Sequence, residues 1–165
     1  MDARKVIAGN PFFADVLGDA EINQLASWTH AVEKAPGEDL IVEDDAGTSL
    51  FIIVSGEVEV LTGDGRRQKH IAMLGPTAVV GEMSLMTGAR RSATVRALSP
   101  LRAIEISDAA LAPIVAATPE LVDRFATVLK DRQAELDRAY GSGPFSLLDQ
   151  GGFASLIRGF FGGRI

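Results

Sequence analysis

Six short runs of β-branched and other apolar residues lie between residues 40 and 106. The runs cover residues 40–42, 50–54, 58–61, 70–74, 93–97 and 101–106. Runs of this length and composition favour β-strands. Gly, Pro and Asp recur between them at short intervals, which is typical of antiparallel hairpins rather than of a parallel sheet. The pattern therefore predicts that the middle of the chain is an antiparallel sandwich or small barrel.

Helical spacing of apolar residues flanks this β region on both sides. Over residues 15–32 the spacing predicts two short helices. Beyond Ser107, which can cap a helix, it predicts a short helix to about residue 117 and a longer one over 119–140. We accordingly divide the chain into an N-terminal helical segment, a β-barrel, a pair of C-terminal helices and a tail, over residues 1–35, 36–106, 107–140 and 141–165.

Two features of the C-terminal part stand out. The apolar stripe of the long helix is interrupted by Arg132, which lies three residues from Leu129 and four from Leu136. A cation on such a face needs a partner. The tail over 141–165 mixes glycines with large apolar residues, and glycine weakens helices. We expect the tail to be weakly ordered and to pack on another surface.

Length and charge exclude several classes of protein. A chain of 165 residues favours one domain. A net charge of −6 and a pI near 4.9 argue against an extended nucleic-acid surface. After the long helix only about 25 residues remain, too few for a helix-turn-helix, so we expect no DNA binding. No apolar run is long enough to span a membrane, and we expect a cytoplasmic chain or the cytosolic part of a membrane protein.

Composition also argues against catalysis. The chain has no cysteine, which removes disulfides, thiolate metal sites and thiol nucleophiles. Only His30 and His70 could supply imidazole, at a predicted helix end and strand start, so we expect no metal site. The sequence contains no nucleophile elbow and no Walker loop. We predict no catalytic residues and no enzyme activity.

The informative stretch covers residues 81–95. It places a glycine before a short segment with helix-starting amides, and then an arginine and a hydroxyl before a strand. Arg91 can supply paired donors, Ser92 a hydroxyl, and Glu82 an acceptor that suits a ribose hydroxyl rather than a phosphate. A sugar phosphate satisfies all three side chains. The alternative is a loop in which an Arg and a Glu merely pair.

This stretch resembles the phosphate-binding cassette of the cyclic nucleotide-binding domain family. The positions that carry the resemblance are Gly81, Glu82, Met83, Ser84 and Leu85, followed by Arg91, Ser92, Ala93, Thr94 and Val95. The likeness covers about residues 10–138 and includes glycines and apolar pairs throughout the β region. It implies an antiparallel jelly-roll β-barrel, or double-stranded β-helix, with N-terminal helices and a C-terminal lid helix. The chain departs from many family members at residues 79 and 80, where valines precede the cassette glycine in place of an aromatic residue.

The resemblance also implies roles for single residues. Arg91 and Ser92 would bind the cyclic phosphate, and Glu82 would accept from the ribose 2′-hydroxyl. Backbone groups would complete the cradle at Gly81, Glu82, Met83 and Ser84. Val60 would line the base pocket. Arg132 matches the position from which bacterial channel members stack an arginine on the purine, and its alternative is an ion pair with a nearby acid such as Asp131 or Glu135.

The function that the resemblance implies is a regulatory module that closes its last helix over a cyclic nucleotide. Ser92 in place of threonine favours cAMP over cGMP. The output would be an attached effector, with the cytosolic domain of bacterial channels as the nearest likeness, or a change in homo-oligomer formation. The alternative is an interaction module that has lost nucleotide binding and docks through its apolar tail.

Overall fold

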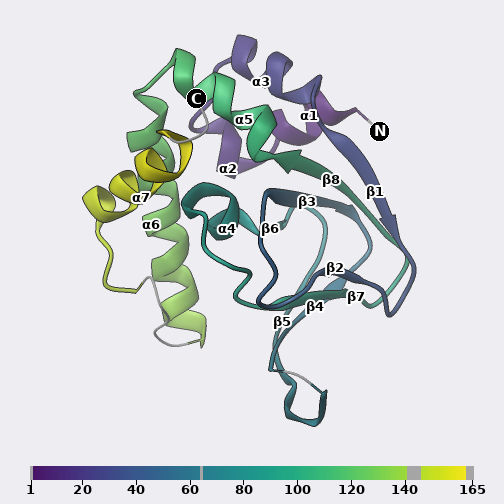
Figure 1. Cartoon of the computed structure of the whole chain (residues 1–165). Helices are drawn as coiled ribbons and strands as arrows, with labels where there is room; N and C mark the ends of the chain where they lie inside the picture. The colour runs from purple at the N-terminus through teal and green to yellow at the C-terminus, as the bar shows by residue number, and fades with distance from the viewer. Residues whose placement is uncertain (1, 64, 141–145, 163–165) are drawn as a thin grey trace.

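Two four-stranded antiparallel sheets form the centre of the molecule (Figure 1). The computed structural model describes residues 2–63, 65–140 and 146–162. The first sheet has the strand order β1-β8-β3-β6 and contains His30–Lys34, Leu101–Ser107, Ser49–Ser55 and Val79–Val80. The second has the order β2-β7-β4-β5 and contains Asp39–Ile41, Thr94–Ala97, Val58–Thr62 and Lys69–Leu74.

Strand β3 explains why the core has two parts. Its side chains alternate between the two faces of the first sheet, as the pleat of a strand requires. Leu50 and Ile52 belong to a cluster with the helices, whereas Phe51 and Ile53 belong to a smaller cluster with residues of the second sheet. All four side chains are buried. A strand covered on both faces has to be apolar throughout, which accounts for the unbroken apolar run at 50–54.

Helices cover the outer face of the first sheet and both ends of the chain lie among them (Figure 1). The N-terminal helices α1, α2 and α3 cover Ala3–Ala8, Pro11–Ala14 and Asp19–Ala26. Helix α4 covers Glu82–Thr87 and lies between β6 and β7 in the sequence. A 3-10 turn covers Gly65–Arg67. Helices α5, α6 and α7 cover Asp108–Ala117, Leu121–Tyr140 and Gln150–Gly162.

Aromatic contacts fasten the N-terminal helices to α6. The ring centroids of Phe12 and Phe13 lie 6.1 and 6.2 Å from that of Phe125, and all three side chains are buried. Arg124 adds a hydrogen bond from Nη1 to the carbonyl of Val16, at 3.2 Å. The N-terminal helices and α6 therefore pack together through buried side chains.

The predicted fold class is confirmed, with one difference in detail. Each of the six predicted runs is a strand, every pairing is antiparallel, and Ser107 caps α5 by accepting from the amide of Ala110 at 3.2 Å. The strands form two separate sheets and do not close into one continuous barrel.

The prediction of two short helices over residues 15–32 is wrong in number and at its end, because that range holds a single helix, α3. Helix α3 ends at Ala26, and the residues from His30 to Lys34 form β1, which pairs with β8. Trp28 is 64% exposed and does not belong to a buried helical face. The reason is that β8 has a free edge beside these residues, and backbone pairing along that edge outweighs a weak local helical pattern.

Over residues 150–162 the tail prediction is wrong about weak order and correct about packing on another surface. These residues form helix α7, whose buried side chains include Phe153, Ile157 and Phe161. Their spacing of four residues places them on one face, and tertiary packing of that face outweighs the low helix propensity of the glycines. The rest of the tail prediction, at 141–145 and 163–165, lies outside the described residues. In the described part of the chain, no helix combines the length and the apolar character needed to cross a membrane.

Candidate functional site

The candidate site is built on the turn between β6 and α4. Gly81 joins them with a φ of 83°, in the left-handed region that suits glycine. A Cβ at this position would also collide with Nη1 of Arg91. The turn presents α4 to the interior of the molecule, where Glu82 and Ser84 are buried. Met83 is half-buried and packs against the helix-side core.

Arg91 turns its guanidinium inward beneath this turn. Nη2 donates to the carbonyl of Ser49 at 2.7 Å, and Nη1 donates to the carbonyl of Gly81 at 3.1 Å. The side chain is 8% exposed. Burial lowers the pKa of the Arg91 guanidinium from its ordinary value, while the carboxylates of Glu105, Glu82 and Asp45 oppose that shift. The group stays protonated at neutral pH, as arginine does in proteins.

Gly47 gives Arg91 the space for this position. A Cβ on Gly47 would lie 2.5 Å from Cβ of Ser84 and 2.6 Å from Nε of Arg91, closer than real side chains pack. Gly47 is therefore part of the site, because only glycine lets β3, α4 and the Arg91 side chain meet here. Gly47 is one of the glycines that separate the predicted strands, but nothing in its spacing showed what it adjoins.

Arg91 has no salt-bridge partner among the carboxylates that the structure describes. Buried charges in proteins are usually paired, because an unpaired charge is costly in a low-dielectric interior. Its neighbour Arg90 is exposed and donates from Nη1 to the carbonyl of Asp44 at 2.8 Å. The inward arginine thus supplies a fixed positive charge that remains available to an anion, whereas the outward one is a surface residue.

Ser92 lies in the segment before β7, and Val60 lies on β4 of the second sheet. Ser92 is exposed and, with Arg91 and Thr94, lines a cleft of about 560 Å³. Val60 pairs with Val95 on one side and Ala72 on the other, and it packs against the core between the sheets. Arg91 and Ser92 therefore line one cleft, whereas Val60 lies on β4, the strand that pairs with β7, and is not among the residues that line this cleft.

Glu82 and Arg132 form an ion pair between the cassette and α6. Nε of Arg132 lies 3.0 Å from Oε1 of Glu82, and Nη2 donates to the carbonyl of Val79 at 3.0 Å. The Glu82 side chain is only 8% exposed. Cζ of Arg132 also lies 5.8 Å from the centre of the Phe12 ring, at cation–π distance. The partner of Arg132 is therefore Glu82, and not the adjacent Asp131 or Glu135 that the sequence offered as the alternative.

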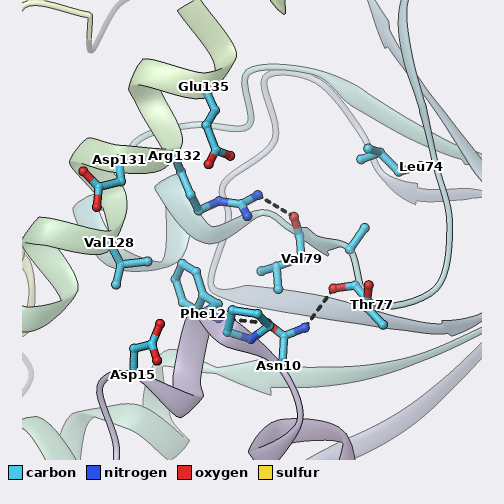
Figure 2. Close-up of a pocket in the computed structure, with 12 residues that line it drawn as sticks. Asn10, Phe12, Asp15, Leu74, Thr77, Val79, Val128, Asp131, Arg132 and Glu135 are labelled. Carbon is cyan, nitrogen blue, oxygen red and sulfur yellow. Dashed lines mark hydrogen bonds between the residues drawn. The ribbon is translucent and has the colours of Figure 1, made fainter.

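Arg132 also lines a second cleft, of about 600 Å³, between α2, α6 and the segment before β6 (Figure 2). Figure 2 shows Phe12 and Val128 on the same side of this cleft as Arg132, and Asn10 pointing toward Thr77. Nδ2 of Asn10 donates to the carbonyl of Thr77 at 2.8 Å, and its Oδ1 accepts from the amide of Phe12 at 3.0 Å. Sequence reasoning missed Asn10 and Phe12 as site residues, because the local cap between them does not reveal their distant partners, Thr77 and Arg132.

The histidines do not gather at this site. His30 begins β1 and His70 lies on β5, where Nδ1 is 3.4 Å from a carboxylate oxygen of Glu59. Among the residues that the structure describes, no three histidine or carboxylate side chains are placed to hold one metal ion. The chemistry of the site is that of a fixed arginine, a buried carboxylate and backbone groups.

Comparison with known proteins identifies the family. Residues 31–118 match the model of the cyclic nucleotide-binding domain, which is more than half of the chain. The chain belongs to the cyclic nucleotide-binding domain family. The matched span contains the cassette, all of α5 and both sheets apart from the first residue of β1, and it ends before α6.

Two curated proteins illustrate the range of relatives. The potassium channel AKT2 of Oryza sativa subsp. japonica is 36% identical over 86 residues, which are 52% of this chain and 10% of the channel. The cyclic AMP receptor protein of Thermus thermophilus is 26% identical over 130 residues, which are 78% of this chain and 60% of that protein. The chain thus spans less than two thirds of the length of these relatives.

Solved structures agree on the fold. A cyclic nucleotide-binding domain from Methylobacillus flagellatus superposes with a TM-score of 0.67 at 27% identity, covering 83% of this chain and 79% of that one. The regulatory domain of Toxoplasma gondii PKA, crystallised with cAMP, superposes with a TM-score of 0.66 over 93% of this chain and 55% of that one. At 21% identity the second likeness concerns the fold alone.

Proposed function

We propose that the chain is a regulatory module that binds cAMP and uses α6 as a lid. The observation that carries the proposal is the buried guanidinium of Arg91, which has backbone partners but no carboxylate partner among the described side chains. An arginine held in this way is prepared for a phosphate, because its charge and donors are already oriented. The hydroxyl of Ser92 and the amides of Gly81, Met83 and Ser84 are the further donors that we assign to the phosphate.

Glu82 is the acceptor that we assign to the ribose 2′-hydroxyl. One of its oxygens, Oε1, is engaged by Arg132, so the other remains for the sugar. The ion pair keeps the carboxylate charged and oriented, and it ties the sugar contact to α6. We assign to Arg132 the further role of covering the base, with Val60 on the opposite side. A ligand that touches both the cassette and α6 favours the arrangement in which they meet.

The output in this proposal is the position of the N-terminal helices. Phe12 and Phe13 pack on Phe125 of α6, so α6 and the N-terminal helices share one core. A change in α6 on nucleotide binding then changes what these helices present to an effector. The potassium channels among the relatives support a channel as the effector, and a change in self-association is the other output that we propose.

Titration calorimetry with cAMP tests the proposal on Arg91 directly. Replacing Arg91 by Ala removes charge-assisted hydrogen bonds to the phosphate and is expected to weaken binding by about 1.5–3 kcal/mol. The matched control is Arg90→Ala, because Arg90 is the neighbouring arginine but points outward. Equal affinities of the wild type and Arg91→Ala would contradict the assignment. No heat with any cyclic nucleotide would favour the alternative of an interaction module without a ligand.

The same titration with cGMP tests the preference for cAMP. Ser92 is the residue from which that preference was predicted, so Ser92→Thr is the informative variant. We expect wild-type protein to bind cAMP more tightly and the threonine variant to lose part of that difference. Recovery of intact nucleotide after long incubation would support a regulatory rather than a catalytic role, as the regulatory relatives suggest.

A further inference from the structure

Helix α7 contacts both elements that the proposed nucleotide site needs to hold together. The buried face of α7 consists of Phe153, Ile157 and Phe161, spaced four residues apart. These side chains belong to the core cluster that also contains residues of α4 and α6. In Figure 1, α7 lies beside α6, close to the end of α4. One helix therefore rests on the cassette and on the lid at once.

The attachment to α6 combines polar and apolar contacts. Nη2 of Arg158 lies 3.0 Å from Oδ1 of Asp123, and Nε2 of Gln150 donates to the carbonyl of Asp123 at 3.2 Å. Asp123 lies in the first turn of α6, while Phe125 and Leu129 contribute the buried apolar surface of that helix. The ion pair is exposed and is worth little by itself. The apolar face is what holds α7 on α6.

The attachment to the cassette is made where α4 ends. Gly88 caps α4 with a φ of 75°, and a Cβ there would lie 2.6 Å from Cδ2 of Phe160. The Phe160 ring therefore lies directly on the backbone that leads from α4 to Arg91. Leu85 and Met86 of α4 are fully buried in the same core cluster. Any movement of α4 relative to α6 has to shift or release this ring.

We infer that α7 is a strap that fastens the lid helix α6 to the cassette helix α4 and thereby strengthens nucleotide binding. The inference rests on the proposed function of the cassette. In the structure α6 already reaches the cassette through Arg132 and Glu82, and α7 fastens the same two elements on another side. Docking of α7 therefore favours the seated lid, by which we mean α6 in contact with the cassette. By linkage, a nucleotide that favours the seated lid also favours docked α7.

The composition of α7 makes the strap releasable. The helix has 13 residues and includes glycines at 151, 152 and 159, and an isolated helix of about this length is marginal in water. The helix is therefore stable only while its apolar face is docked. Undocking and unfolding of α7 are one event, which gives the strap two distinct states.

Substitutions at two neighbouring positions of α7 separate the effect of undocking from the effect of a new charge on the helix. Ile157→Asp places a charge in the buried face, whereas the control Leu156→Asp places the same charge at a residue that is 36% exposed. We expect Ile157→Asp to weaken cAMP binding about tenfold, within the usual range of coupling between two sites, and to speed release. Phe160→Ala, a milder change that removes the ring next to Gly88 together with its contact with Phe161, is expected to act in the same direction. The affinity of Leu156→Asp should match that of the wild type.

A second readout distinguishes failure of the strap from failure of the proposed function. The chain lacks cysteine, so a single Lys130→Cys carries one spin label on the exposed side of α6. We expect Ile157→Asp, but not Leu156→Asp, to increase the motion of this label without any nucleotide. The strap would be overturned if the label motion did not change in Ile157→Asp. It would also be overturned if neither Ile157→Asp nor Phe160→Ala weakened cAMP binding. Absence of cAMP binding in the wild type would overturn the proposed function, while increased label motion would still support the strap.

Discussion

At the scale of single residues, the site depends on where two opposite charges are held. Arg91 is buried on backbone carbonyls, and Glu82 is buried against Arg132. Both positions follow from local backbone features, since Gly81 allows the turn and Gly47 leaves the space. A substitution at either glycine therefore acts on the charged groups through packing.

The assignment of Glu82 to the ribose is tested with 2′-deoxy-cAMP, a ligand that lacks the 2′-hydroxyl. We expect the wild type to bind cAMP about 10- to 100-fold more tightly than 2′-deoxy-cAMP, because a hydrogen bond to a charged group is lost. Glu82→Gln should reduce that ratio, because the loss of the ion pair with Arg132 affects both nucleotides alike, whereas the loss of the sugar contact affects cAMP alone. Glu135→Gln, an exposed carboxylate on α6, serves as the control and should preserve the ratio. Undiminished discrimination in Glu82→Gln would assign the sugar contact to another residue.

Gly47 offers a test of the packing that positions Arg91. Gly47→Ala would place a Cβ 2.6 Å from Nε of Arg91, so the arginine has to move. Overpacking of this kind is expected to cost about 1–3 kcal/mol of unfolding free energy, with weaker cAMP binding as well. Gly75→Ala is the control, because nothing lies within 4 Å of its Cβ position. Urea denaturation measures the stability and calorimetry measures the affinity. An unchanged affinity in Gly47→Ala would mean that this position of the Arg91 side chain is not required for binding.

At the scale of elements, the N-terminal helices are joined to the sheets by a small number of polar contacts. Asn10 is 3% exposed, caps α2 and donates to the carbonyl of Thr77 before β6. This side chain therefore links the proposed output helices to the strand that leads into the cassette. Its position beside the cleft in Figure 2 places the link next to Phe12.

Loss of Asn10 is expected to destabilise this junction. Asn10→Ala removes a buried helix cap and a buried hydrogen bond, which together cost about 1–3 kcal/mol. Asp2→Ala removes the exposed cap of α1, where the contact with the amide of Lys5 is 3.3 Å, and should cost less. Chemical denaturation of the two variants provides the comparison. Equal stability of Asn10→Ala and Asp2→Ala would show that the link to Thr77 contributes little.

The elements also show what the sequence could predict. The six strands with apolar or β-branched runs were predictable because their pattern is local. Strand β1 was not, because its edge position leaves its side chains largely exposed, and β6 has only two residues. Helix α7 was missed because its glycines argue against a helix until its apolar face meets α4 and α6.

The candidate site was predictable in its residue types and only partly in its geometry. Gly81, Glu82, Arg91 and Ser92 lie within twelve positions of each other, so one pattern predicted them together. The pairing of Glu82 with Arg132 crosses 50 residues and depends on how α6 packs on the sheet. Helical spacing showed that Arg132 needed a partner, but it could offer only acids on the same helix.

At the scale of the whole molecule, one continuous core joins the N-terminal helices, the first sheet, α4, α6 and α7. A ligand that binds the folded state at this junction therefore stabilises the whole molecule rather than one lobe. The cassette turn lies between the core shared with the helices and the core between the sheets. Nucleotide binding at the cassette is therefore expected to raise the stability of the whole molecule toward unfolding.

Thermal unfolding is therefore expected to respond to nucleotide. At a cAMP concentration about 100 times the Kd, binding adds about 2.7 kcal/mol to the stability of the wild type. For a chain of this size that corresponds to a rise in Tm of about 5–10 °C. Arg91→Ala should show at most about half of that rise at the same concentration, because its binding is weaker by about 1.5–3 kcal/mol, whereas Arg90→Ala should show the full rise. A rise of equal size in Arg91→Ala would show that the nucleotide binds without this arginine.

The most direct measurement is a crystal structure of the chain with cAMP, read for the distance between the phosphate oxygens and the guanidinium of Arg91. The account predicts a phosphate oxygen within hydrogen-bond distance of Arg91 and Ser92, with the ribose 2′-hydroxyl on Glu82 and α7 docked on α4 and α6. A nucleotide seated elsewhere, such as in the cleft beside Phe12 and Val128 with its phosphate away from Arg91, would contradict it.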